Sequence, residues 1–231
     1  MKMVFQKFEN DLSLECGCVN VVRIEDKALF SRCVESLNLA FSAESPEPAM
    51  VFESGAPLKP KDCIFMVGDL LAFDLADRKI VNLALRRIVE DLSKYEGVVA
   101  NLELLNNGIV GLLEDQMNQM AGDYVIEGDW DAAAFLKAAG FSIDSVVEDG
   151  LFGKACRFLH IAADLFPDKV LAFVNLNTYL DKDQYCEFGR MAKANELIIL
   201  SYEVGDSPDF EYFENGMFID ANYCEFSSLP G

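Results

Sequence analysis

Apolar and polar residues follow a regular pattern in the C-terminal third of the chain. Residues 170–174 and 197–200 form two short apolar runs, and residues 181–193 between them are mostly polar, with Tyr185 and Phe188 three positions apart. Short apolar runs on either side of an amphipathic helix are typical of a βαβ unit in a parallel sheet that is buried on both faces. The pattern therefore predicts strand, helix and parallel strand in this region.

The N-terminal part shows similar apolar runs, which predict strands over residues 3–8, 19–24 and 63–67. A helix is expected from Lys27 to about residue 41. Glu25 and Asp26 lie at its start, where the helix dipole favours negative charge.

The middle of the chain is helical in pattern. Apolar side chains at helical spacing predict four helices, over residues 77–95, 97–120, 129–140 and 148–166. The last of these leads back into the C-terminal parallel unit. We therefore expect an α/β head formed by residues 1–76 and 148–231, with residues 77–147 inserted as a helical lobe.

The charge of the chain restricts its partners. Among 231 residues, 39 are acidic and 19 are lysine or arginine, which gives a formal charge of −20 at pH 7. Such a surface repels nucleic acid over most of its area, so a DNA partner would need a local basic patch or a bridging cation. The apolar runs are too short to span a bilayer, and the charged N-terminus lacks the apolar core of a signal peptide. We expect a cytoplasmic protein with no membrane partner.

The turn after the predicted strand 19–24 is the position of a P-loop in nucleotide-binding folds. A P-loop needs glycines, so that backbone amides can approach phosphate, followed by Lys and Ser or Thr. From Arg23 to Phe30 the chain reads RIEDKALF, with no glycine and with two carboxylates where the phosphates would lie. We therefore expect no bound nucleotide.

One face of the predicted helix 77–95 is basic. Four side chains lie within about 100° of one another on the side opposite the apolar stripe, namely Lys79, Arg86, Arg87 and Lys94. Glu90 interrupts this face, but five basic and three acidic residues between positions 77 and 94 leave a net charge of +2. These four residues are our candidates for DNA phosphate contacts, and an ordinary solvated helix face is the alternative.

An acidic stretch precedes the predicted helix 129–140. Residues 114–131 hold six carboxylates and no basic residue. Calcium takes several carboxylate and carbonyl oxygens in flexible geometry, and the candidate ligands are Glu114, Asp115, Asp123 and Glu127. The spacing does not match an EF-hand loop. The alternative is a solvated acidic loop with a helix cap at Asp129.

The order of the predicted elements resembles the nucleotide-binding domain of the ABC-ATPase type. In that fold the strand corresponding to residues 170–174 ends in paired acidic residues, a Leu-Asp turn follows, and the next strand ends in His. The corresponding positions here are Val174-Asn175-Leu176-Asn177, Leu180-Asp181 and Ser201-Tyr202-Glu203. The resemblance implies a degenerate ABC-ATPase-like (P-loop-type) head with a mostly parallel sheet, from which the catalytic carboxylates and His are missing.

Three blocks of sequence resemble the subtype-specific spacer-acquisition protein of type II-A CRISPR systems. They are VVRIED at residues 21–26 followed by Phe30-Ser31-Arg32, VGDLLAFD at residues 67–74, and residues 169–203 with Phe173-Val174-Asn175 and the Leu180-Asp181 turn. The resemblance implies a homotetrameric ring whose basic inner wall encircles double-stranded DNA ends, with calcium stabilising the assembly. It also implies action beside the Cas integrase pair and the effector nuclease, with no catalytic activity of its own.

Two other hypotheses compete with this one. A degenerate ATPase-like scaffold that binds proteins and never contacts nucleic acid fits the acidity of the chain. A metal-dependent phosphohydrolase would need Asp69, Asp74 and Asp181 to converge from separate strand ends. The single histidine, His160, lies beside Leu159 in the apolar register of a helix and is predicted to be a packed core residue rather than a catalyst.

Overall fold

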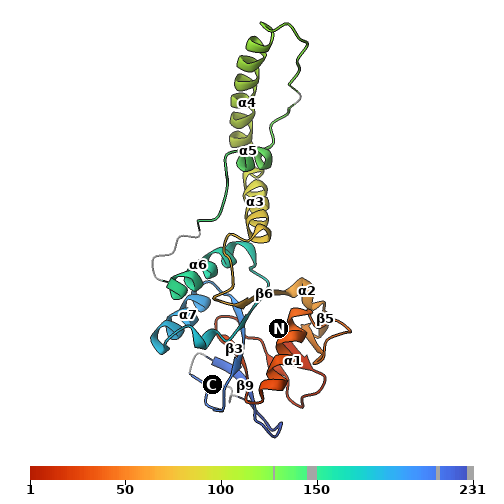
Figure 1. The fold of residues 1–231 in the computed structure, drawn as a ribbon, viewed down its shortest axis with the longest axis vertical. Helices are drawn as coiled ribbons and strands as arrows, with labels where there is room; N and C mark the ends of the chain where they lie inside the picture. Colours follow the sequence, from red (N-terminus) through yellow and green to blue (C-terminus); the bar gives the residue numbers. More distant parts are fainter. Residues whose placement is uncertain (127, 145–149, 212–213, 228–231) are drawn as a thin grey trace. The chain divides into compact units, whose positions relative to one another are not determined.

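The computed structural model describes residues 1–126, 128–144, 150–211 and 214–227. The chain forms two compact units, one made of Met1–Asp74 with Val146–Gly231 and the other of Leu75–Ser145 (Figure 1). We call them the α/β unit and the helical unit. Among the described residues, no helix has the length and apolar character needed to cross a membrane.

The α/β unit is built on a six-stranded sheet in the order β10-β9-β3-β8-β7-β6. The strands are β3 (Val19–Ile24), β6 (Ile64–Asp69), β7 (Val170–Val174), β8 (Ile198–Val204), β9 (Glu214–Ile219) and β10 (Glu225–Ser227). All neighbours run parallel except β9 and β10. The predicted parallel pair β7 and β8 is confirmed, and β3 lies between β8 and β9, where every residue of the strand except Arg23 is fully buried.

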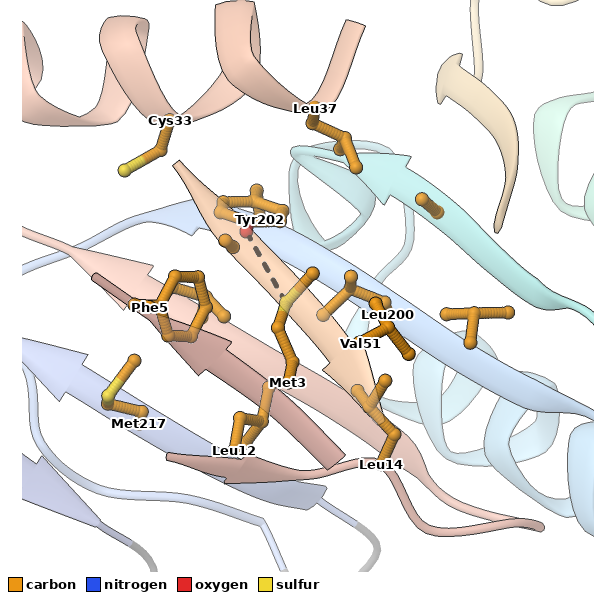
Figure 2. Packing of buried hydrophobic residues seen from close by; sticks show 14 of the residues in the cluster. Met3, Phe5, Leu12, Leu14, Cys33, Leu37, Val51, Leu200, Tyr202 and Met217 are labelled. Atoms are coloured by element: carbon orange, nitrogen blue, oxygen red, sulfur yellow. Dashed lines mark hydrogen bonds between the residues drawn. The ribbon is translucent and has the colours of Figure 1, made fainter. Parts of the chain in front are cut away.

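A second, antiparallel sheet covers part of one face of the first. Its order is β2-β1-β4-β5, from strands β1 (Lys2–Phe5), β2 (Leu12–Ser13), β4 (Ala49–Glu53) and β5 (Ala56–Leu58). Figure 2 shows its apolar side chains packed together with those of β8 and of helix α1 (Lys27–Asn38). Within this core the hydroxyl of Tyr202 donates to the sulfur of Met3 at 3.9 Å, so the largest buried side chain of β8 has a polar partner.

The other face of the six-stranded sheet packs on aromatic residues from two helices, α6 (Gly150–Leu165) and α7 (Lys182–Ala194). Phe173 of β7 makes edge-on contacts with Phe158 of α6, at 6.1 Å between ring centroids, and with Phe188 of α7, at 5.6 Å. All three rings are fully buried. The apolar faces of these two amphipathic helices therefore cover the sheet, as expected for a parallel βαβ unit.

Helix α7 begins with a capping box. The side chain of Asp181 accepts from the amide of Gln184 at 2.9 Å, and the Gln184 side chain accepts from the amide of Asp181 at 3.2 Å. Without these two side chains, the backbone amides of Asp181 and Gln184 would have no partner within the helix.

We expect Asp181→Ala to lower the free energy of unfolding by about 1 kcal/mol, because the first turn of α7 loses its cap. Urea denaturation followed by circular dichroism measures the change. Asp183→Ala is the matched control, because this exposed acid lies on the same turn and has no capping hydrogen bond among the described contacts. Equal destabilisation by the two changes would contradict a capping role for Asp181.

The helical unit contains α3 (Arg78–Leu92), α4 (Glu96–Met117) and α5 (Ala132–Ala138). Helix α3 is capped by Asp77, whose side chain accepts from the amide of Lys79 at 2.8 Å. Helix α5 packs against α3. The predicted cap at Asp129 is wrong: Asp131 caps α5 by accepting from the amides of Ala133 and Ala134, because the helix begins three residues later than expected.

Several predicted boundaries also differ from the structure. The strand expected from Cys63 begins one residue later, because Pro60–Cys63 forms a short helix, α2, with proline in its first turn. The helix expected to reach residue 41 ends at Asn38, where Ala40 and Phe41 have positive φ. The start predicted for α6 at residue 148 lies outside the described residues.

His160 is exposed, so its prediction as a packed core residue is wrong. The buried side chains of α6 are Ala155, Phe158, Leu159 and Ala162. His160 follows two of them directly, and its position on the helix turns it away from the sheet.

Candidate functional site

The basic face predicted on α3 is exposed to solvent. Lys79, Arg86 and Arg87 lie on the helix, and Lys94 lies two residues beyond its last residue. All four side chains are exposed. The burial of Leu85 on the other side of the helix indicates which face points outward. The structure therefore places the four candidate DNA-binding residues on an accessible surface.

Asp91 is a feature of this face that the sequence analysis missed. Its carboxylate lies 2.6 Å from Nζ of Lys94 and 3.5 Å from Nε of Arg87. The hydrogen bond from Lys94, with the charge of Arg87 nearby, lowers the pKa of Asp91 below its ordinary value. The sequence does contain a signal for this pair of contacts, because Asp91 lies four residues after Arg87 and three before Lys94, and residues at these spacings are neighbours on a helix. Among the described residues, Lys79 and Arg86 make no ion pair, so these two cations can meet a phosphate without first leaving a carboxylate, whereas Arg87 and Lys94 share the exposed Asp91.

The predicted calcium ligands are not gathered into a site within the part of the chain that the structure describes. Glu114 and Asp115 lie on the last turn of α4, and Asp123 lies in the segment that follows, all of them exposed. Glu127 lies outside the described residues. Their oxygens are the kind that calcium prefers. However, the described residues contain no group of three or more Asp, Glu, His or Cys that could hold a metal ion.

Helix α4 presents an apolar stripe whose exposure no prediction anticipated. None of its 22 residues is buried. The stripe is formed by side chains at alternating spacings of four and three, namely Val98, Leu102, Leu105, Ile109 and Leu112. Leu105 is 65% exposed and Ile109 is 56% exposed. Spacings of four and three are those of a coiled-coil seam, which packs against a second helix. We call these five residues the α4 seam.

The position of the missing P-loop is occupied by the chain itself. The side chain of Asp26 accepts from the amide of Leu29 at 2.6 Å, so it caps α1 where a phosphate would bind. Glu25 accepts from the amide of Ala221 at 2.9 Å. Both carboxylates therefore satisfy backbone amides and place negative charge at the start of the helix.

The carboxylates of the phosphohydrolase hypothesis also have structural partners. Asp69 accepts from the hydroxyl of Tyr179 and from the amide of Leu71, and the Tyr179 hydrogen bond lowers the pKa of Asp69. Asp181 caps α7. These contacts account for the two acids without a bound metal.

The strand ends that resemble an ATPase site carry an amide side chain and a buried carboxyl whose pKa is raised. Asn175 follows β7 with a positive φ of 53° and accepts from the amide of Val204. Glu203, near the end of β8, is fully buried, and burial raises its pKa to about 7. Hydrogen bonds from the Ser201 hydroxyl and the Asn177 amide, together with Arg23, oppose that rise.

Comparison with known proteins agrees with the resemblance found in the sequence. The family model of the CRISPR-associated protein Cas_Csn2 matches residues 45–212. The CRISPR-associated protein Csn2 of Enterococcus faecalis is 22% identical over 209 residues, which cover 88% of this chain and 90% of that protein. The family match takes in residues of both units and far more than half of the chain. The chain therefore belongs to the Csn2 family of CRISPR-associated proteins, the adaptation family of type II-A systems.

Proposed function

We propose that this protein is a non-enzymatic ring that binds double-stranded DNA ends during CRISPR adaptation, when new spacers are acquired. Membership of the Csn2 family implies the role in adaptation. The observation that carries the DNA contact is the exposed basic face of α3, with Lys79, Arg86, Arg87 and Lys94, in a chain of charge −20. Phosphate contacts from such a face bind duplex DNA without reading its sequence.

The head is proposed to be a degenerate ABC-ATPase-like fold that binds no nucleotide. The central parallel strand β3 leads directly into α1, as a P-loop strand would. Asp26 uses an amide of the first turn of α1 that a phosphate would need, and Glu25, held by the amide of Ala221, adds a second negative charge beside it. The loss of the acidic pair after β7, where Asn175 and Asn177 stand, supports the absence of catalysis.

Assembly into a homotetramer is supported by the α4 seam. An apolar helix stripe of this length is costly to leave in water, and a second copy of the same helix offers a complementary surface. A contact between two copies of the same helix closes as a two-fold dimer, and a second interface between such dimers would complete a tetramer. Each copy carries a charge of −20, so bound cations would reduce repulsion between copies. We propose that calcium does this at the acidic residues Glu114, Asp115, Asp123 and Glu127.

The proposed partners are double-stranded DNA ends, the Cas integrase pair and the effector nuclease. A closed ring can take a duplex into its central hole only at a DNA end. Its preference for ends therefore follows from threading and needs no recognition of the end itself. The competing function is a protein-binding scaffold that never contacts DNA, and the overall acidity of the chain favours it.

A gel-shift titration separates the two functions. The purified protein is mixed with a linear duplex and with the same duplex closed into a circle, with calcium or with chelator, at one fixed salt concentration. We expect binding to linear DNA only, and strongest with calcium. Equal binding to both forms would contradict threading, and no binding to either form would leave the scaffold function.

A further inference from the structure

A buried cluster of charged side chains lies on the α7 face of the six-stranded sheet. Arg23 of β3 and Glu203 of β8 are direct neighbours in the register of these parallel strands. Glu214 begins β9, and Tyr185 comes from α7. Glu203 is fully buried, and the side chains of Arg23 and Glu214 are 12% and 3% exposed. One cation and two carboxyl groups are thus removed from water together.

The guanidinium of Arg23 is committed to partners other than Glu203. It donates to the carbonyl oxygens of Ser207, at 3.2 Å, and Asp209, and its Nη2 lies 3.4 Å from a carboxylate oxygen of Glu214. The ring of Phe210 lies against it, 5.1 Å from ring centroid to guanidinium carbon. The cation is therefore matched with the charge of Glu214.

Glu203 is left with neutral hydrogen-bond donors. Its Oε1 accepts from the hydroxyl of Ser201 and, at 3.3 Å, from the amide of Asn177. Burial raises the pKa of Tyr185 well above its ordinary value, so that side chain stays neutral near pH 7. A second buried negative charge without a cation of its own is unfavourable. Among the described residues the cluster has one cation, Arg23, and it is paired with Glu214. Glu203 is therefore expected to carry a proton, in agreement with its raised pKa.

Glu203 also connects β8 to the turn that follows β7. This turn begins at Asn175 and contains a short 3₁₀ helix, η1 (Leu176–Thr178). The amide of Asn175 donates to the carbonyl of Tyr202 at 2.8 Å, and the amide of Val204 donates to the side chain of Asn175. Together with the contact from Asn177, these bonds hold the turn against the end of β8.

We propose that Glu203 is a proton-dependent lock on the turn between β7 and α7: the protonated carboxyl stays buried and keeps the turn closed, and ionisation favours opening. When the turn opens, the carboxyl reaches water and ionises at an ordinary pKa near 4.5, whereas in the closed state it ionises near pH 7. Opening therefore becomes easier as the pH rises from about 5 to 7 and levels off above 7, where both states are ionised. The lock does not depend on DNA binding.

Amide hydrogen exchange of the whole chain between pH 5 and pH 8 tests the proposal. After correction for intrinsic exchange rates, the opening constant of the amides at residues 175–179 should rise about 40-fold from pH 5 to pH 7 and only about twofold more by pH 8. In Glu203→Gln, which cannot ionise, these amides should lose that rise. A rise of the same size in the variant would overturn the lock.

Glu214→Gln tests the count of charges separately. Arg23 then has Glu203 as its only carboxyl neighbour in the cluster, so Glu203 should ionise at lower pH and the rise in opening should shrink. A response like that of the unchanged protein would show that the two carboxyls do not compete for Arg23.

Carbon-13 NMR of labelled glutamate side chains provides a readout that needs no variant. One carboxyl should titrate near pH 7, and the absence of any glutamate titrating above pH 6 would overturn the proposal.

Discussion

Replacing Leu105 and Ile109 by glutamate is expected to break the proposed homotetramer into smaller species while the helices remain folded. The two side chains lie one helical turn apart at the centre of the α4 seam, and both are more than half exposed within the chain. Burial of each against a second copy contributes about 1.5–3 kcal/mol. Losing both should weaken self-association by at least about a hundredfold, before the added charge is considered.

Sedimentation equilibrium over a range of protein concentrations measures the loss, and circular dichroism checks the fold. Leu104→Glu is the matched control. Leu104 neighbours the seam and is 70% exposed, but it points away from the stripe. We expect this variant to assemble like the unchanged protein. If Leu104→Glu disrupts assembly as strongly as the double variant, self-association is not specific to the seam.

The double variant Arg86→Glu and Arg87→Glu is expected to lose at least about a hundredfold in affinity for linear duplex DNA, with its oligomeric state unchanged. Two favourable phosphate contacts become two repulsive ones on the same exposed face. The salt dependence should fall as well, because each lost phosphate contact lowers the slope of log affinity against log salt by about 0.9. Fluorescence anisotropy at several salt concentrations measures both quantities.

Arg190→Glu with Lys193→Glu is the matched control, since it makes the same change in charge at two exposed positions of α7. It should leave DNA affinity within a few-fold of the original. Asp91→Asn should act in the opposite direction and tighten binding, because it frees Arg87 and Lys94 from their shared carboxylate. Unchanged affinity in the Arg86 and Arg87 variant would exclude this face from DNA binding.

Sequence reasoning identified the elements whose burial is encoded by an uninterrupted apolar run or by a helical stripe. The strand Val19–Ile24 was predicted with its observed bounds, and the βαβ unit around α7 is parallel as expected. In both cases most of the buried residues are apolar, so the pattern itself indicates which surfaces are buried.

Other elements form only because of distant partners. Strand β9 contains Glu214, Asn215 and Gly216, which have low strand propensity, and it is held in the sheet by pairing with β3. Gly216 is needed there because any side chain would collide with the ring of Phe210. The strand Ala49–Glu53 likewise depends on a partner distant in sequence, because it pairs with β1.

The candidate sites divide in the same way. The basic face could be read from helical spacing alone, and so could Asp91, since its partners lie three and four residues away. The cluster around Glu203 could not, because it requires the register of β3 against both β8 and β9. The α4 seam was visible in the sequence, but only the structure shows that no residue of that helix is buried.

The position of β3 at the centre of the sheet has a consequence for synthesis of the protein on the ribosome. Val19 pairs with Ile199 on one side and with Glu214 on the other, so both neighbours of this strand are made near the end of translation. The helical unit, a compact unit formed by the continuous stretch Leu75–Ser145, can form while β3 is still unpaired. During that interval an apolar strand stays exposed, which is the condition under which chains aggregate or recruit chaperones. We therefore expect nascent chains that stop before β8 to need such protection, although the finished sheet buries β3 almost completely.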